Sequence, residues 1–257
     1  MSNSKGFGLL QVANAVGFAA TAVVNILANA LPLNGKTTAE LSDAYPNLIT
    51  PAGYVFSIWG IIYVLLMAFV VYQLLPGRRD ETFVGRIGYL FLFSCGANIS
   101  WIFLWHYEQV LLSMPVMFAL LGSLILIYTR LNIGRSDVGR RERLLVHLPF
   151  SVYLGWITVA PIANVAAAMV SMGLDGLGLG EPVWAALMIA VAVILTVLVI
   201  YTRGDLAYSL VIVWALGGII VKQSAVQMIV VSSGAGIIAI LAAMVVRRFT
   251  SSFQGRL

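Results

Sequence analysis

The sequence predicts an all-α protein, a polytopic bundle of membrane-spanning helices. Hydrophobic residues make up 61% of its 257 residues and charged residues 10%, whereas a soluble domain carries about 25% charged residues. Eight long apolar segments fill the chain, and most reach the roughly 20 residues that a helix needs to cross the hydrocarbon core of a bilayer. Of the 15 Lys and Arg residues, 13 lie in every second gap between these segments, a distribution typical of cytoplasmic loops.

The first apolar segment resembles a signal peptide, because Ala28-Asn29-Ala30 is similar to a cleavage site. Its apolar stretch is longer than the core of a typical signal peptide, and Lys5 is the only basic residue before it, so we expect a membrane helix. The seventh segment is short, and the turn to the eighth is tight. The expected spans are 7–31, 53–75, 87–105, 109–131, 147–172, 183–202, 206–222 and 225–246.

The positive charge predicts the orientation of these spans. The alternate gaps that hold most of it are the N-terminus, 76–86, 130–146, 203–205 and the C-terminus, whereas the other gaps hold only Lys36 and Lys222. We therefore expect both termini in the cytoplasm of a cell whose plasma membrane the protein spans several times. An odd number of helices would divide the arginine clusters between the two sides, so the charge pattern itself favours eight.

Composition also excludes several kinds of partner and site. The net charge of +5 comes from arginines in short loops between apolar segments, which indicates contact with anionic lipid headgroups and not with nucleic acid. Cys95 is the only cysteine, so no disulfide can form within the chain. His106 and His147 stand apart at segment ends, so we expect no metal site.

The longest outer gap, residues 32–52, precedes the second span. Thr37 or Thr38 is well placed to cap a short helix there. Long loops in compact proteins are often lids or binding elements. The loop is therefore a candidate lid over a site, and a plain connector is the equally simple alternative.

Aromatic and amide residues inside three spans are the candidates for a binding site, because membrane helices have no general need for them at mid-depth. Helical spacing places Trp59 with Tyr63 on one face, and Asn98 with Trp101 on another. On the fifth span, Trp156, Ala160 and Asn164 follow one another at steps of four residues and so share one helix face. If the three helices face one another, they form an aromatic cavity suited to a flat, largely apolar ligand. The candidates are Tyr54, Phe56, Trp59, Tyr63, Asn98, Trp101, Tyr153, Trp156, Ala160 and Asn164.

A purely structural interpretation competes for each of these residues. Asn98 and Asn164 could be hydrogen-bonded packing contacts between helices. Trp105, Tyr107 and Trp184 lie near the outer ends of spans, where we expect aromatic residues of the membrane interface.

Three motifs resemble the tryptophan-rich sensory protein family, which is also the translocator protein or peripheral benzodiazepine receptor family. The run from Thr50 to Tyr63 is similar to its signature before and within the second helix, Asn98-x-x-Trp101 to its third-helix motif, and Tyr153-x-x-Trp156-x-x-x-Ala160-x-x-x-Asn164 to its fifth-helix motif. The resemblance covers about residues 7–172. It implies a five-helix bundle that binds porphyrins, sterols or isoquinoline-type drugs beneath the loop before the second helix, and a tendency to form homodimers.

The chain departs from the family pattern in the first motif. It has a single proline, Pro51, where the family usually has two, and Tyr54 or Gly53 replaces the family's first tryptophan. Some bacterial relatives are associated with light-dependent porphyrin breakdown that depends on tryptophans, so the substitution counts against that activity here.

Residues 173–257 carry three further spans, which we interpret as a membrane annex to the five-helix core of residues 1–172. Gly217-Gly218 and Ser232-x-x-x-Gly236 would allow close helix packing. The lysine of the seventh span, Lys222, could carry a retinal Schiff base, but it lies at the outer end and no buried carboxylate counter-ion is visible, so a side chain that reaches to water is preferred.

The sequence thus predicts a membrane protein that binds a flat lipophilic ligand such as a porphyrin, another tetrapyrrole or a sterol, for sensing or transport. No cofactor is expected apart from such a ligand. A permease for a small amphipathic solute is the alternative, although the spans lack the carboxylates that ion-coupled transport usually needs. A porphyrin-degrading enzyme ranks third.

Overall fold

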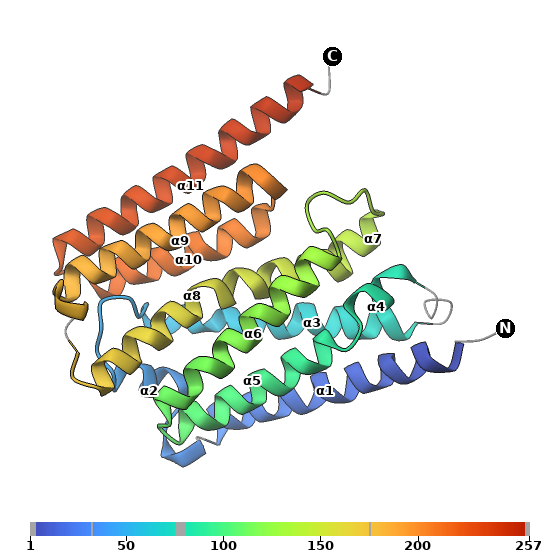
Figure 1. Cartoon of the computed structure of the whole chain (residues 1–257), viewed down its shortest axis with the longest axis horizontal. Helices are drawn as coiled ribbons and strands as arrows, with labels where there is room; N and C mark the ends of the chain where they lie inside the picture. The colour runs from blue at the N-terminus through green and yellow to red at the C-terminus, as the bar shows by residue number, and fades with distance from the viewer. Residues whose placement is uncertain (1–3, 32, 76–80, 175, 255–257) are drawn as a thin grey trace.

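The structure, a computed structural model, describes residues 4–31, 33–75, 81–174 and 176–254. Eight long helices run along one common direction in this part of the chain (Figure 1). They are α1 (Ser4–Ala30), α3 (Ile58–Leu74), α5 (Leu90–His106), α6 (Val110–Arg130), α8 (Leu148–Ser171), α9 (Glu181–Arg203), α10 (Leu206–Lys222) and α11 (Gln227–Gln254). The described residues contain no β-strand, so the predicted all-α bundle is confirmed.

Short elements connect the long helices. The helices α2 (Thr38–Asp43), α4 (Thr82–Ile87) and α7 (Arg140–Glu142) are accompanied by the 3-10 turns η1 (Leu33–Gly35), η2 (Gly53–Ser57) and η4 (Gly176–Gly178) and by the π-helical turn η3 (Arg143–His147). Thr37 caps α2: its hydroxyl accepts the Glu40 N–H and the Glu40 carboxylate accepts the Thr37 N–H.

The second and third predicted spans begin three or more residues before their long helices. The second begins as the 3-10 turn η2 and becomes α-helical only at Ile58. The third begins at Leu90 and not at residue 87, because Gly88 has φ 54° and ends the short helix α4, which lies in the predicted loop 76–86. The predicted seventh span, 206–222, coincides with α10.

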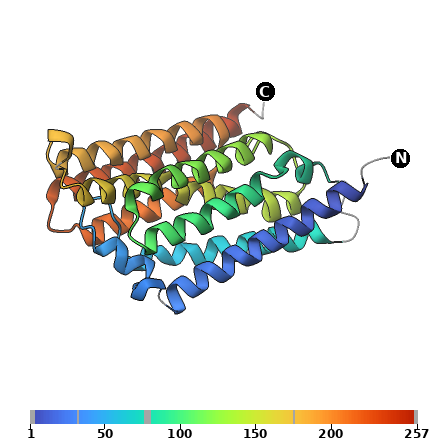
Figure 2. The ribbon, with the colours of Figure 1, turned by 60° about the horizontal axis from the view of Figure 1, so that its bottom comes forward.

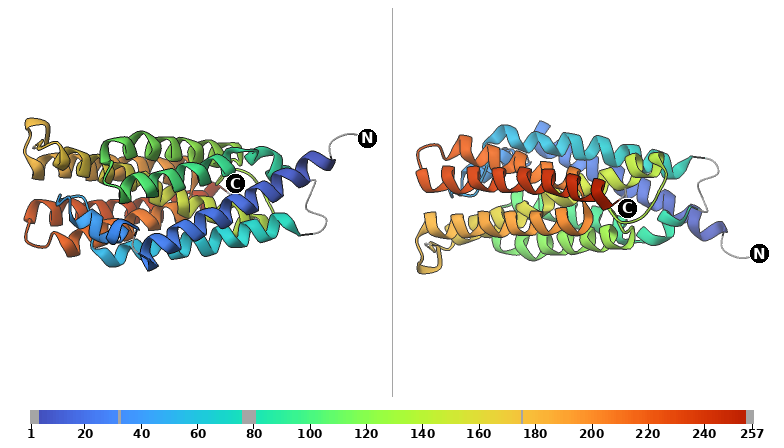
Figure 3. Two further views of the ribbon diagram at one scale, coloured as in Figure 1. Left: turned by 90° about the horizontal axis from the view of Figure 1, so that it is seen from below. Right: turned by 90° about the horizontal axis from the view of Figure 1, so that it is seen from above.

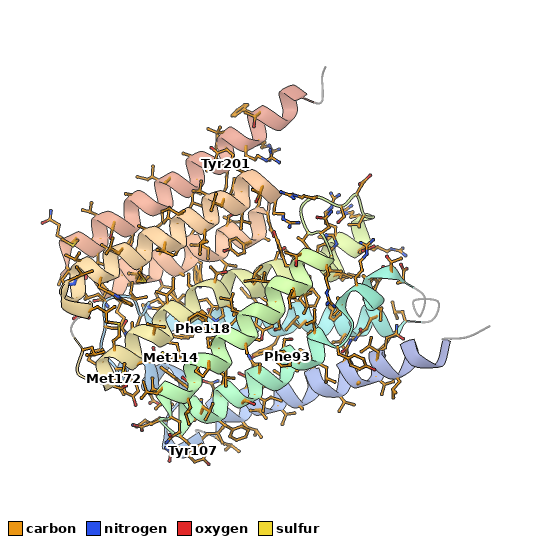
Figure 4. All side chains as sticks on the ribbon, viewed as in Figure 1. Phe93, Tyr107, Met114, Phe118, Met172 and Tyr201 are labelled. Carbon is orange, nitrogen blue, oxygen red and sulfur yellow. The ribbon has the colours of Figure 1, made fainter. Side chains whose placement is uncertain are left out.

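The surface of the bundle is apolar around its sides. Six of its helical segments are long and apolar enough to cross a membrane, and α5 and α10 are apolar helices of 17 residues each. Phe93, Phe118 and Tyr201 are about half exposed on the outside of the bundle (Figure 4). Continuous exposed apolar surface of this kind belongs in lipid and not in water.

Helix α8 is the central helix. It packs against α6, α3 and α10, while α1 packs against α5 and α3 (Figure 2). The annex helices α9, α10 and α11 pack mainly on one another and join the core through α10 and α8. Gly155 of α8 permits that junction, because a Cβ atom there would lie 2.9 Å from the Tyr208 carbonyl oxygen and 3.0 Å from the Val211 Cβ.

The two ends of the bundle differ in charge. Helix α1 begins and α11 ends at the same end (Figure 3), and Arg130 and Arg203 close α6 and α9 there. At the opposite end, the Lys36 ammonium lies 2.7 Å from the Glu108 carboxylate, and Lys222 pairs with Asp43. The topology therefore places Arg130 and Arg203 at the opposite end of the bundle from Lys36 and Lys222.

Candidate functional site

A pocket lies beneath α2 and the loop before α3, between core and annex. It offers about 70 Å³ of space to a water-sized sphere, and its walls come from α3, α5, α8, α9 and α10. Helices α9 and α10 contribute an apolar wall of Met188, Ile189, Ala192, Ala215, Leu216 and Ile219. The annex is thus part of the pocket and does not merely flank it.

Four of the six tryptophans of the chain line this pocket. The Trp59 ring stacks near Trp101, with centroids 6.4 Å apart, and meets Trp156 edge-on at 6.2 Å. Trp101 in turn stacks on Trp105 at 5.8 Å. Phe56 of η2 closes the set by an edge contact with Trp156. The result is a cage of aromatic faces and edges drawn from three helices and one turn.

Asn164 of α8 orients one of these rings. Its amide oxygen accepts a 2.8 Å hydrogen bond from the Trp101 Nε1, and its amide nitrogen donates to the Ser113 hydroxyl of α6 at 2.9 Å. Asn164 therefore lies at the pocket and also joins three helices, so the binding and the packing interpretations apply to the same side chain.

Asn98 of α5 has a different position. It is fully buried, accepts a 2.7 Å hydrogen bond from the Asn25 amide of α1 and donates to the Tyr153 hydroxyl at 3.2 Å. It does not line the pocket. Its contacts support the packing interpretation, because both of its amide groups are used between helices.

The predicted site residues fall into three groups. Tyr63, Asn98 and Tyr153 support the pocket from beneath, because both phenol rings contact Trp59 and Asn98 bonds to Tyr153. Tyr54 lies outside: it is half exposed and packs edge-on against Trp214 of α10. The six that line the pocket are Phe56, Trp59, Trp101, Trp156, Ala160 and Asn164.

Three polar atoms of the lining have no partner in the described part of the chain. They are the indole Nε1 atoms of Trp105 and Trp156 and the hydroxyl of Thr38, all buried. A buried donor without an acceptor is unfavourable by about 1–3 kcal/mol. The two indole N–H groups are thus donors without a protein acceptor in residues that form the wall of this pocket.

A second hollow lies on the other side of Trp59. It is a more open groove of about 600 Å³ between α1, α2 and α3, with Asn25, Asn29 and Tyr63 on its walls. Thr38, Phe56 and Trp59 line both spaces. Those side chains thus separate the tryptophan-lined pocket from the groove.

Sequence reasoning missed some of the lining. Trp105 and Trp184 were expected at the membrane interface, but both are buried, with 4% and 7% of their surface exposed. Trp105 lines the pocket. Tyr107 is exposed, as expected. The signal for Trp105 was available, because it lies four residues after Trp101 and therefore shares its helix face. The annex wall carried no signal, since its lining residues are as apolar as those that face outward.

Lys222 lies outside the pocket, at the C-terminal end of α10, where it pairs with Asp43. In the described residues, no three His, Cys, Asp or Glu side chains lie together in a way that could hold a metal ion. Nothing in the lining itself is a carboxylate, so the chemistry of the pocket is aromatic stacking combined with N–H and O–H donation.

A comparison with protein families agrees with the motifs. A family model described as TSPO-like protein matches residues 11–246. This match reaches past residue 172 through α9 and α10 and into α11, further than the resemblance of the motifs alone. No curated protein and no solved structure gives a significant match. Because the family model covers most of the chain, this membrane protein belongs to the TSPO-like protein family.

Proposed function

We propose that the protein binds a flat, largely apolar ligand with acceptor oxygens in the tryptophan pocket. The observation that carries this proposal is the convergence of Trp59, Trp101, Trp105 and Trp156 on one cavity, where two of the indole N–H groups lack a partner. Aromatic faces favour stacking with a flat π-system. Buried donors favour a ligand that supplies oxygen acceptors.

These features favour a tetrapyrrole such as a porphyrin over a sterol. A porphyrin has a flat π-face for stacking and carboxylate groups that can accept from the Trp105 and Trp156 N–H groups. A sterol has neither a π-face nor more than one hydroxyl in its simplest form. We therefore expect protoporphyrin IX to bind more tightly than cholesterol.

The size of the pocket requires a rearrangement on binding. Ligand pockets for drug-sized molecules occupy about 300–1,000 Å³, and the space in this pocket is about 70 Å³. Movement of Phe56 and Trp59 would join it to the groove of about 600 Å³ on the α1 side. The bound form therefore differs from the structure described here at these two side chains.

The test is a titration of the detergent-solubilised protein with protoporphyrin IX. Because four of the six tryptophans line the pocket, bound porphyrin should quench most of the tryptophan fluorescence and saturate at one ligand per chain. A linear, non-saturating loss of fluorescence would contradict a specific site. Competition with cholesterol then ranks the two ligand classes, and flux measurements in liposomes separate a binder from a transporter.

A further inference from the structure

Three hydrogen bonds join the segment before α3 to the annex helix α10 and the residue that follows it. The Gln223 side-chain amide donates to the Asn47 carbonyl at 3.0 Å, and the Ala52 N–H donates to the Gly218 carbonyl at 3.1 Å. The Trp214 indole N–H donates to the Val55 carbonyl, also at 3.1 Å. Each bond uses a backbone atom of the loop; Trp214 and Gly218 lie one turn apart on α10, and Gln223 directly follows its last residue.

The packing between the loop and α10 depends on a glycine. A Cβ atom at Gly218 would lie 2.1 Å from the Val55 Cγ2 and 3.1 Å from the Pro51 Cβ, whereas a Cβ at the neighbouring Gly217 would meet nothing within 4 Å. Non-bonded carbon atoms do not approach one another to 2.1 Å, so a side chain at position 218 requires Val55, the loop or α10 to shift.

Further contacts continue this attachment on both sides of the three hydrogen bonds. Lys222 pairs with Asp43 at the end of α2, and the Tyr54 and Trp214 rings meet edge-on at 5.4 Å. The Lys222 and Asp43 side chains are partly exposed, and exposed ion pairs stabilise little. The hydrogen bonds to Gly218 and Val55 matter more, because backbone groups within a membrane bundle have little water as an alternative partner.

The attached segment also closes the pocket. Ile49, Pro51 and Phe56 line the pocket, and the Phe56 ring rests on Trp156. Displacement of residues 47–57 from α10 would withdraw these side chains from the pocket and enlarge it. The contacts with α10 and the volume of the pocket are therefore linked through one short segment.

We propose that α10 is a latch that holds residues 47–57 over the pocket, and that ligand enters and leaves when this segment separates from α10. The exchange of ligand rests on the function proposed above, but the latch itself does not. The annex thus controls how fast the site opens, in addition to forming one of its walls.

The sharpest test compares Gly218→Val with Gly217→Val. The same valine is added one residue apart on the same helix, but only the first collides with Val55. Hydrogen–deuterium exchange of the peptide that contains Ala52 reports the latch directly, because the Ala52 N–H is the donor to Gly218. We expect faster exchange in Gly218→Val only. Stopped-flow quenching by protoporphyrin IX should then show association and dissociation about tenfold faster, with Kd changed much less than either rate.

A second variant covers the case in which Gly218→Val fails to fold. Trp214→Phe keeps the ring against Tyr54 and removes only the donor to Val55, and it should shift exchange and rates in the same direction by a smaller factor. Unchanged deuterium exchange in both variants would overturn the latch. Faster exchange with unchanged porphyrin rates would overturn its role in access and favour a path past Trp59 from the α1 groove. If porphyrin does not bind at all, the proposed ligand is wrong, and deuterium exchange still decides the latch.

Discussion

The Trp101 indole and the Asn164 amide form a 2.8 Å hydrogen bond that joins α5 to α8 at the wall of the pocket. Both residues are buried, and the same amide also bonds to Ser113 of α6. The bond fixes the plane of one aromatic wall, so the shape of the pocket and the packing of three helices both depend on Asn164.

Replacement of Asn164 by leucine should therefore affect both stability and binding. The Trp101 N–H and the Ser113 hydroxyl each lose a partner, and interhelical bonds of this kind contribute about 0.6–2 kcal/mol in membranes. We expect a lower melting temperature and weaker porphyrin binding. Asn98→Leu is the matched variant, since Asn98 is bonded between helices but lies outside the pocket. It should lose stability but much less affinity than Asn164→Leu, because it acts on the pocket only through Tyr153, and equal loss of affinity in both variants would contradict the geometry.

Trp156→Phe should weaken binding with little change in stability. The substitution keeps an aromatic ring against Phe56 and Trp59 and removes an indole N–H that has no partner in the described structure. One hydrogen bond to a charged acceptor is worth about 1.5–3 kcal/mol, so the Kd for protoporphyrin should rise at least about tenfold. Trp184→Phe, outside this pocket, serves as the control. Equal affinities of the two variants for protoporphyrin would show that the Trp156 N–H does not contact the ligand.

Ala192→Leu tests whether the annex is part of the site. Ala192 belongs to the α9 wall of the pocket, so a larger side chain should occupy the space that the ligand needs. We expect the affinity to fall by a factor of about ten or more, since overpacking a filled site is unfavourable by about 1–3 kcal/mol. Ala190→Leu, on the exposed side of the same helix, should bind normally. Unimpaired binding by Ala192→Leu would place the ligand away from the annex.

The loop that covers the pocket should be attached most firmly between mildly acidic and moderately alkaline pH. The Lys36 ammonium lowers the pKa of Glu108 below 4.5, and the Glu108 carboxylate raises the pKa of Lys36 above 10.5. Glu108 stabilises the folded chain fully above the pKa of a carboxyl group in the unfolded chain, and this stabilisation is lost as the pH falls through its lowered pKa in the folded chain. The stabilisation by Lys36 is lost as the pH rises through its raised pKa. Both side chains are exposed, so the effect is small and weakened by salt. Melting curves at several pH values should show it, and Lys36→Ala should abolish it.

Both termini should lie in the cytoplasm. The structure places the start of α1 and the end of α11 at the end of the bundle that carries Arg130 and Arg203, and positive loops remain cytoplasmic. Fusions of alkaline phosphatase to either terminus should be inactive in bacterial cells, while green fluorescent protein at either terminus should fluoresce. Active phosphatase at one terminus alone would contradict the eight-crossing topology.

The sequence predicted the bundle well because composition, length and charge act over whole segments. It predicted local geometry less well where backbone conformation departs from the α-helix. Tyr54 was a candidate site residue at the start of the expected span 53–75, but it lies in η2, which is a 3-10 turn. Because a 3-10 helix has about 3.0 residues per turn and an α-helix 3.6, the direction of Tyr54 is not given by α-helical spacing. Tyr54 consequently faces Trp214 and not the pocket.

The amide partners could not be predicted either. Helical spacing indicates which residues share a face, but it does not say which neighbouring helix that face meets. Asn98 and Trp101 are three residues apart, yet Asn98 bonds to Asn25 of α1 and Trp101 to Asn164 of α8. The order in which helices pack is a tertiary property, and only the structure separates the packing amide from the amide at the pocket.

Ala192, Ala215 and Leu216 of α9 and α10 close one side of the pocket, so the chain cannot be shortened to its first five helices without changing the pocket. Removal of everything after residue 172 would leave the cavity open along one flank, where acyl chains would fill it. A truncated five-helix fragment would then report the affinity of a different site. Helices α9 and α10 are thus part of the cavity itself, and a chain without them would have a cavity of another shape.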